Sequence, residues 1–135
     1  MTVRPITPGL FVSGDRPHLI GGRHRESGAY AFPCPADPDF EPVPLASEGT
    51  LWSYTVQRFR PKSPPYAGPE AFEPYAVGYV ALPGQLIVEA RLTGVAFDAL
   101  RRDMPMRMTT IAFTTDPDGG IVETYAFEPI AENRP

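Results

Sequence analysis

Hydrophobic and polar residues alternate strongly over residues 50–59, TLWSYTVQRF. Trp52, Tyr54 and Val56 fall at every second position of this run, which is rich in aromatic and β-branched residues. Because successive side chains of a strand point to opposite faces, a period of two predicts a β-strand with one buried face. On this pattern we expect Trp52 to lie in the core.

Similar patterns predict four more strands and one short helix. The predicted segments are, in order, the strands 75–83 (YAVGYVALP) and 85–94 (QLIVEARLTG), the helix 95–103 (VAFDALRRD), and the strands 106–115 (MRMTTIAFTT) and 121–130 (IVETYAFEPI). Pro83-Gly84 is a turn signal, so the first two of these strands are expected to form a hairpin. The sequence DPDGG predicts a tight turn before the last strand.

This order of elements favours an all-β fold. A five-stranded barrel with a short helix between its third and fourth strands is the OB-fold. The chain divides near residue 48, because the preceding part is rich in proline and lacks long alternating runs. We therefore expect an N-terminal appendage over residues 1–48, an OB-fold over residues 49–130 and a frayed tail at residues 131–135.

Composition and charge argue against several classes of protein. The 135 residues carry a net charge of −4, whereas nucleic-acid binding draws most of its affinity from basic groups. No apolar run approaches the roughly 18 residues that a membrane span needs. The N-terminus does not have the pattern of a signal peptide, and Cys34 is the only cysteine. These features predict a cytoplasmic protein without nucleic-acid or membrane partners.

The stretch RHRESGAYAFPCPADPD, residues 23–39, has the spacing of a metal-binding ribbon. His24 and Ser27 form one pair separated by two residues, and Cys34 and Asp37 form another. Serine is a poor zinc ligand. The stretch is therefore a zinc site, the remains of one, or a coincidence. Cys34 with His24 as a base is a weak candidate nucleophile, and we assign no catalytic residue.

Several segments resemble one family in the same order. They are HLIGGRHRESGAYAFP, then CPAD, then GTLWSYTV, then EPYAVGYVALPGQLIVEARLTG, LRRDMPMRM and YAFEP. This set, over roughly residues 18–130, resembles the acyl-CoA-associated zinc-ribbon/OB-fold proteins, classed as domain of unknown function family thirty-five. In that family a rubredoxin-like ribbon with four cysteines precedes the barrel. Here three of those cysteines are replaced, by His24, Ser27 and Asp37.

The resemblance implies a partner subunit rather than an independent enzyme. Family members work beside thiolase-superfamily proteins on acyl-CoA, in lipid, steroid or polyketide chemistry, and the catalytic residues belong to the thiolase. It implies a hetero-oligomer with two copies of each subunit, in which the OB-fold helps to form the CoA or acyl tunnel. With so few ligands left, we expect a degenerate ribbon without zinc or another firmly bound cofactor. Packing onto the barrel or onto another subunit would then hold it, through Tyr30, Phe32, Phe40 and Leu45.

The segment 60–74, RPKSPPYAGPEAFEP, is a long proline-rich loop, and such loops are often functional. Its residues and their neighbours supply candidate contacts to a CoA ester or a partner. These candidates are Arg58, Arg60, Lys62, Tyr66, Phe72 and Tyr75. Guanidinium groups recognise phosphates well, and aromatic side chains anchor interfaces. A solvated loop and a barrel cap remain the alternatives.

Three functions remain open at this point. The first is the non-catalytic companion subunit of a thiolase-like enzyme. The second is an autonomous acyl-CoA hydratase or thioesterase, which would need a carboxylate or histidine in a pocket. The third is a single-stranded nucleic-acid binder, which the acidic charge disfavours.

Overall fold

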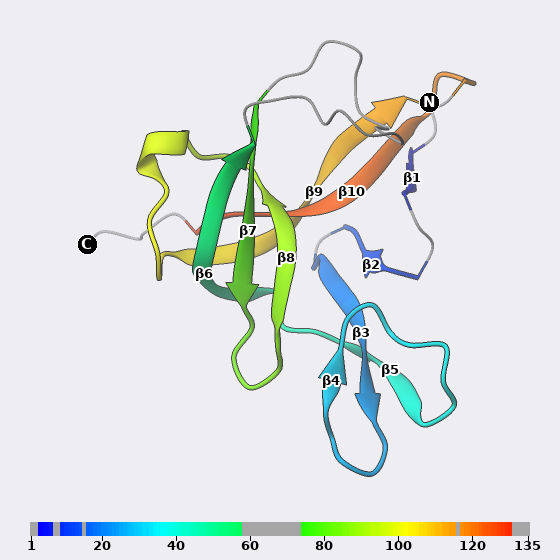
Figure 1. Ribbon diagram of the computed structural model, residues 1–135. Helices are drawn as coiled ribbons and strands as arrows, with labels where there is room; N and C mark the ends of the chain where they lie inside the picture. Colours follow the sequence, from blue (N-terminus) through cyan, green and yellow to red (C-terminus); the bar gives the residue numbers. More distant parts are fainter. Residues whose placement is uncertain (1–2, 7–8, 15, 58–73, 116, 131–135) are drawn as a thin grey trace.

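The computed structural model describes residues 3–6, 9–14, 16–57, 74–115 and 117–130 (Figure 1). The loop between the first two barrel strands and the C-terminal tail predicted from sequence therefore lie mainly outside the described residues. Within the described residues, no helix is long and apolar enough to span a membrane.

Five strands in the second part of the chain close into a barrel. They are β6 (Glu48–Gln57), β7 (Tyr75–Ala81), β8 (Ile87–Leu92), β9 (Pro105–Thr115) and β10 (Ile121–Pro129). Strand β6 pairs with β7 and β9, β7 pairs with β8, and β10 closes the ring by pairing with β9 and β8. Only the β10–β8 pairing in this ring is parallel. This closure confirms the predicted OB-fold.

The predicted hairpin and short helix are also confirmed in outline. Strands β7 and β8 are antiparallel, and Gly84 in their connection has a φ of 70°, which glycine adopts without strain. The segment between β8 and β9 forms one turn of 3₁₀ helix, η1 (Phe97–Ala99), rather than a longer α-helix. The buried Leu100, directly after it, contributes to the core.

The barrel interior is filled by alternating side chains of all five strands. The largest fully buried side chains in the structure are Phe127, Leu19, Leu51, Met106 and Val80. Gly49 is packed directly against the backbone carbonyl of Ala81, so a side chain at this position would force the two strands apart. Burial of this apolar surface is the main source of stability of the barrel.

The prediction that Trp52 lies in the core is wrong. The pairing of β6 with β7 shifts by one residue between Leu51 and Ser53, which is a β-bulge. A bulge changes the face to which the following side chains point. Trp52 therefore does not share the face of Val56, which packs on the core. Beside the buried Leu51, Trp52 is 51% exposed and meets the ring of Tyr79 edge-on, with centroids 6.4 Å apart.

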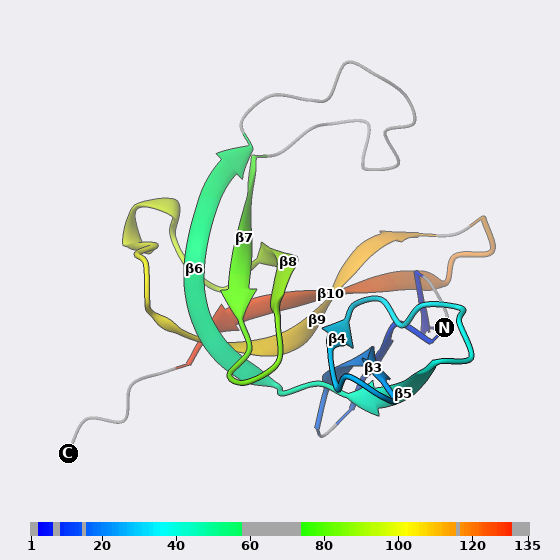
Figure 2. The same ribbon diagram turned by 60° about the horizontal axis from the view of Figure 1, so that its bottom comes forward.

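The N-terminal part adds five short strands. They are β1 (Val3–Pro5), β2 (Phe11–Val12), β3 (His18–His24), β4 (Tyr30–Ala31) and β5 (Phe40–Pro44). Strand β1 extends the barrel sheet by parallel pairing with β10. Strand β3 pairs with β2, β4 and β5, and we call the unit of β3, β4 and β5 the ribbon. Figure 2 shows the ribbon on one side of the barrel, close to the N-terminal segment.

The base of the ribbon shares the core of the barrel. Phe11, Leu19 and Leu45 belong to the same hydrophobic cluster as the buried side chains of β6 to β10. Tyr30 and Phe32 pack against this cluster, whereas Phe40 packs on His24 within the ribbon. The expected packing on the barrel is thus found for Tyr30, Phe32 and Leu45.

Candidate functional site

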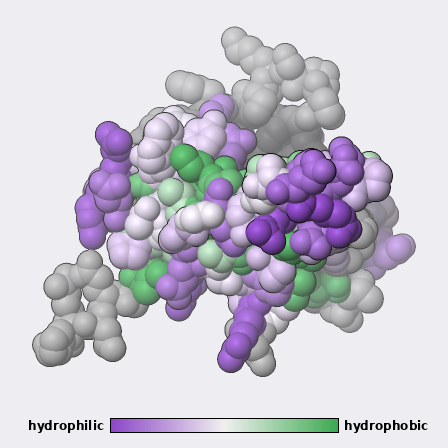
Figure 3. Space-filling view, turned by 90° about the horizontal axis from the view of Figure 1, so that it is seen from below, coloured by the Kyte–Doolittle hydropathy of each residue, from purple (hydrophilic) through white to green (hydrophobic). Residues whose placement is uncertain are grey.

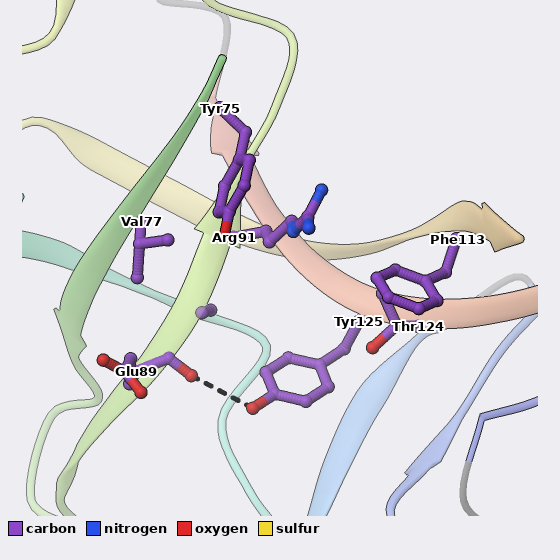
Figure 4. Close-up of a pocket in the computed structure, with 8 residues that line it drawn as sticks. Tyr75, Val77, Glu89, Arg91, Phe113, Thr124 and Tyr125 are labelled. Carbon is purple, nitrogen blue, oxygen red and sulfur yellow. Dashed lines mark hydrogen bonds between the residues drawn. The ribbon is translucent and has the colours of Figure 1, made fainter. Parts of the chain in front are cut away.

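Of the six candidate contacts predicted around the long loop, the structure describes only Tyr75. The other five lie outside the described residues, namely Arg58, Arg60, Lys62, Tyr66 and Phe72. Tyr75 is the first residue of β7, directly beyond this loop. Its ring forms one wall of a pocket on the outer face of the barrel (Figure 4).

This pocket is built around the guanidinium group of Arg91. The central carbon of the group lies 3.8 Å from the ring centre of Tyr75 and 5.4 Å from that of Phe113. Such positions over aromatic faces attract a cation through the ring quadrupole. Three strands supply these residues, since Tyr75 belongs to β7, Arg91 to β8 and Phe113 to β9. The pocket therefore depends on the closure of the barrel.

The far side of the pocket is fixed by Tyr125 of β10. Its hydroxyl donates a hydrogen bond of 3.0 Å to the backbone carbonyl of Glu89 (Figure 4). Burial raises the pKa of Tyr125, and the negative charge of Glu89 raises it further. The phenol consequently stays protonated and remains a donor. Val77, Ala90 and Thr124 complete the lining of a cavity of about 380 Å³.

The pocket carries one positive and one negative side chain on the same strand. Glu89 and Arg91 are two residues apart, so both point to the outer face of β8. Glu89 is exposed and Arg91 is half-buried. Among the described residues, the structure shows no carboxylate or carbonyl oxygen bound to the guanidinium of Arg91. Among the described residues, the cation thus contacts aromatic rings and no acceptor oxygen.

Sequence reasoning did not identify Arg91, Phe113 or Tyr125 as site residues. The alternation of Glu89 and Arg91 with buried neighbours places both on the outer face of a strand. Their neighbours depend on pairing, since Val77 lies opposite Arg91 and Ala126 lies beside it. A single sequence does not contain this register.

Four side chains of the ribbon match the family's zinc ligands, and each contacts a nearby backbone group. They are His24, Ser27, Cys34 and Asp37. Nδ1 of His24 accepts hydrogen bonds from the amides of Glu26 and Ser27, at 3.3 and 3.2 Å. The Ser27 hydroxyl oxygen accepts from the amide of Ala29 at 3.2 Å, and an Asp37 carboxylate oxygen accepts from the amide of Asp39 at 2.8 Å. The side chains that match zinc ligands thus cap their own turns.

Cys34 has its own packing role. Its sulfur lies 3.6 Å from the carbonyl of Pro35 and sits directly over Gly22, where an added Cβ would approach it to 2.9 Å. Within the described residues, no group of three or more histidine, cysteine, aspartate or glutamate side chains is gathered as a metal site. With a neutral serine and a His24 nitrogen already engaged, these residues do not fit the closed four-ligand arrangement of structural zinc.

Arg25 links the two turns of the ribbon, which sequence reasoning missed. Its backbone amide donates to the carbonyl of Asp39 at 2.9 Å, and its Nε donates to the carbonyl of Pro38 at 3.1 Å. Its Nη1 forms an exposed ion pair of 3.3 Å with Glu41. These contacts connect the segments that a metal ion would otherwise join.

The ribbon also meets the barrel at Tyr125. Phe32 packs edge-on against this ring, with centroids 5.6 Å apart, and Phe11 lies 6.3 Å away. A hollow of about 430 Å³ beside Phe32 and Tyr125 is lined by apolar side chains that include Leu10 and Ile87, and by Glu89. Tyr125 therefore belongs both to the Arg91 pocket and to the ribbon junction.

Exposed aromatic and aliphatic side chains continue the outer face beside the Arg91 pocket. Trp52, Tyr79 and Ile87 are 51%, 44% and 46% exposed. They come from the three neighbouring strands β6, β7 and β8. By contrast, the view from below shows hydrophobic residues as separate patches among hydrophilic ones (Figure 3). The outer face of β6 to β8 is the better candidate for an interface.

Comparisons with known proteins agree with this fold. A family model described as the C-terminal OB-fold domain of ChsH2 matches residues 42–110. The benzoylsuccinyl-CoA thiolase subunit BbsA of Thauera aromatica is 32% identical over an alignment of 124 residues that covers 87% of this chain and 80% of that protein. A DUF35 domain-containing scaffold protein of Pyrococcus furiosus is 31% identical over an alignment of 122 residues that covers 85% of each chain.

A solved structure is similar as well. The chain matches a structure named Ltp2-ChsH2(DUF35) aldolase with a TM-score of 0.60 and 27% sequence identity, covering 83% of this chain and 84% of that chain. The similarity thus includes the ribbon side of the molecule as well as the barrel. On these sequence and structural matches, the chain belongs to the DUF35 family of OB-fold proteins.

Proposed function

We propose that this chain is the non-catalytic companion subunit of a thiolase-superfamily enzyme that acts on acyl-CoA. The observation that carries the proposal is the similarity to a named thiolase subunit over 80% of that protein's length. The match to an aldolase assembly that contains a DUF35 protein supports it independently. The chain would stabilise the complex and help to form the CoA or acyl tunnel.

The interface in this proposal is the outer face of β6 to β8. Trp52 and Tyr79 are exposed there and packed against each other, so little side-chain freedom is lost on binding. The candidate residues of the neighbouring loop, among them Arg58, Arg60 and Lys62, would contact the phosphates of the CoA ester. The complex would contain two copies of each subunit, in the cytoplasm.

The ribbon would work in this complex without metal. Its turns are capped by His24 and Asp37 and joined through Arg25. Its base is packed on the barrel core through Leu45 and Phe32. It would then serve as a scaffold and docking element.

Turnover assays separate a companion subunit from an enzyme in its own right. Acyl-CoA consumption is measured for this chain alone, for a thiolase-like protein from the same organism, and for the two together. We expect no turnover by this chain alone and a faster or newly present reaction when both are mixed. Turnover by the isolated chain, lost in a His24→Ala variant, would instead support an autonomous enzyme.

A further inference from the structure

The Arg91 pocket has a chemistry that the CoA proposal does not use. A half-buried guanidinium is stacked over Tyr75 and near Phe113, and no oxygen acceptor binds it among the residues described. A cation over a ring face is attracted by the π-system, and this contact leaves its N–H donors without an oxygen acceptor. Figure 4 shows the group extending past the Tyr75 ring toward Phe113. The free edge is thus available to an incoming acceptor.

The geometry and charge favour a carboxylate as that acceptor. A carboxylate is planar and pairs with a guanidinium edge through two parallel hydrogen bonds. Glu89 also lines the cavity and would repel a ligand with several negative charges. The chain itself has a net charge of −4, which further disfavours a polyphosphate at a site with a single cation.

The surroundings favour a carboxylate supplied by a protein surface. The pocket lies on the same outer face as the exposed side chains of Trp52, Tyr79 and Ile87. Aromatic side chains and arginine are the residue types that dominate binding energy at protein interfaces. Because Glu89 lies beside Arg91, the pocket is complementary to a partner surface that carries a basic side chain next to an acidic one. The basic side chain would face Glu89 and the acidic one Arg91.

We propose that Arg91, held between Tyr75 and Phe113, is a carboxylate-binding site that receives an acidic side chain of the thiolase-fold partner. This inference rests on the proposed function, because the partner supplies the ligand. Tyr75 and Phe113 act as positioning residues, since they hold the guanidinium in place and screen it from water. Tyr125 supports the same pocket through its hydrogen bond to the Glu89 carbonyl.

The first arm of the test uses benzoate and inorganic phosphate as probes on the full chain. NMR titration follows the Nε–H signal of Arg91 and the backbone amides of β7 and β8. We expect saturable shifts with benzoate, weaker shifts with phosphate, and none with either probe in Arg91→Gln. An absence of benzoate shifts in the wild type, or equal shifts in the variant, would overturn the carboxylate site.

The second arm measures the affinity for a thiolase-like protein from the same organism. Arg91→Gln should weaken binding by about tenfold or more, because an interfacial charge pair loses one member. The affinity of Arg91→Lys should lie between those of the wild type and Arg91→Gln, because lysine keeps the charge but lacks the planar edge of the guanidinium. Arg107→Gln is the matched control, since it removes the same charge at the exposed pair with Glu128 and should change affinity less than about twofold.

The two arms distinguish the possible sources of the carboxylate. Benzoate binding with unchanged partner affinity in Arg91→Gln would contradict the partner assignment and indicate a small-molecule carboxylate. If the wild-type chain does not bind the thiolase-like protein at all, the proposed function fails. The benzoate titration then still decides the chemistry of the pocket.

Discussion

The barrel and the tip of the ribbon are stabilised in different ways. The tip comprises the two turns over residues 24–29 and 37–40. In the barrel, side chains distant in sequence are buried together, as Leu51 and Phe127 are. At the ribbon tip, His24 and Asp37 bind amides only two or three residues further along the chain. Long-range apolar burial tolerates little change, whereas local capping can be exchanged residue by residue. In the proposed metal-free ribbon, these local hydrogen bonds would hold the tip in the place of a metal ion.

Core truncation should produce the largest contrast between the two regions. Phe127 is fully buried in the barrel, so Phe127→Ala should lower the free energy of unfolding by about 3–5 kcal/mol. Phe40 is half-buried at the ribbon tip, so Phe40→Ala should cost only about 1 kcal/mol. Urea unfolding followed by circular dichroism measures both. Equal losses in the two variants would remove the distinction between barrel and tip.

Tyr125 should show a smaller effect that depends on pH. Tyr125→Phe removes the hydrogen bond to the Glu89 carbonyl and should cost about 1 kcal/mol at neutral pH. The pKa of Tyr125 is raised above 10.0 in the folded state, because burial and Glu89 favour the neutral phenol. Its contribution is therefore full below pH 10 and is lost as the pH rises through the folded-state pKa.

Urea unfolding at pH 7, 9 and 11 checks this sign. The wild type should lose stability between pH 9 and 11 by more than Tyr125→Phe does. Parallel pH profiles for the two proteins would show that Tyr125 does not titrate as its environment implies.

His24 should affect only the ribbon tip. His24→Ala removes the acceptor for the amides of Glu26 and Ser27 and should cost about 1 kcal/mol or less, because these groups can bind water instead. Hydrogen exchange at the two amides should become faster, while that of β6 to β10 stays unchanged. His18→Ala is the control, since its Nδ1 contacts only the nearby Arg16 carbonyl. Slower or unchanged exchange at Glu26 and Ser27 would disprove the capping role.

Removal of metal should have the smallest effect. We expect a chelator to shift the melting temperature of the tag-free protein by less than about 1 °C, because a structural zinc would contribute many kcal/mol to folding. A variant with cysteine at positions 24, 27 and 37 restores four thiolates and serves as the positive control. Near-stoichiometric zinc in the purified wild-type protein would contradict the metal-free ribbon.

The sequence predicts the barrel better than it predicts the site. Alternation in β7 and β8 and the Pro83-Gly84 turn identify a hairpin, because these signals are local. The bulge beside Trp52 is set by pairing with β7, so alternation alone places this residue on the wrong face. The Arg91 pocket needs three strands in register, which no local pattern records. The contact of Phe32 with Tyr125 also joins residues far apart in the sequence, so no local pattern predicts it.

The most direct test of the central claim is native mass spectrometry of this chain co-expressed with a thiolase-like protein from the same organism. The account predicts one stable assembly with two copies of each subunit. A spectrum in which this chain is found only by itself, while the thiolase-like protein forms its own complete oligomer, would contradict the companion role.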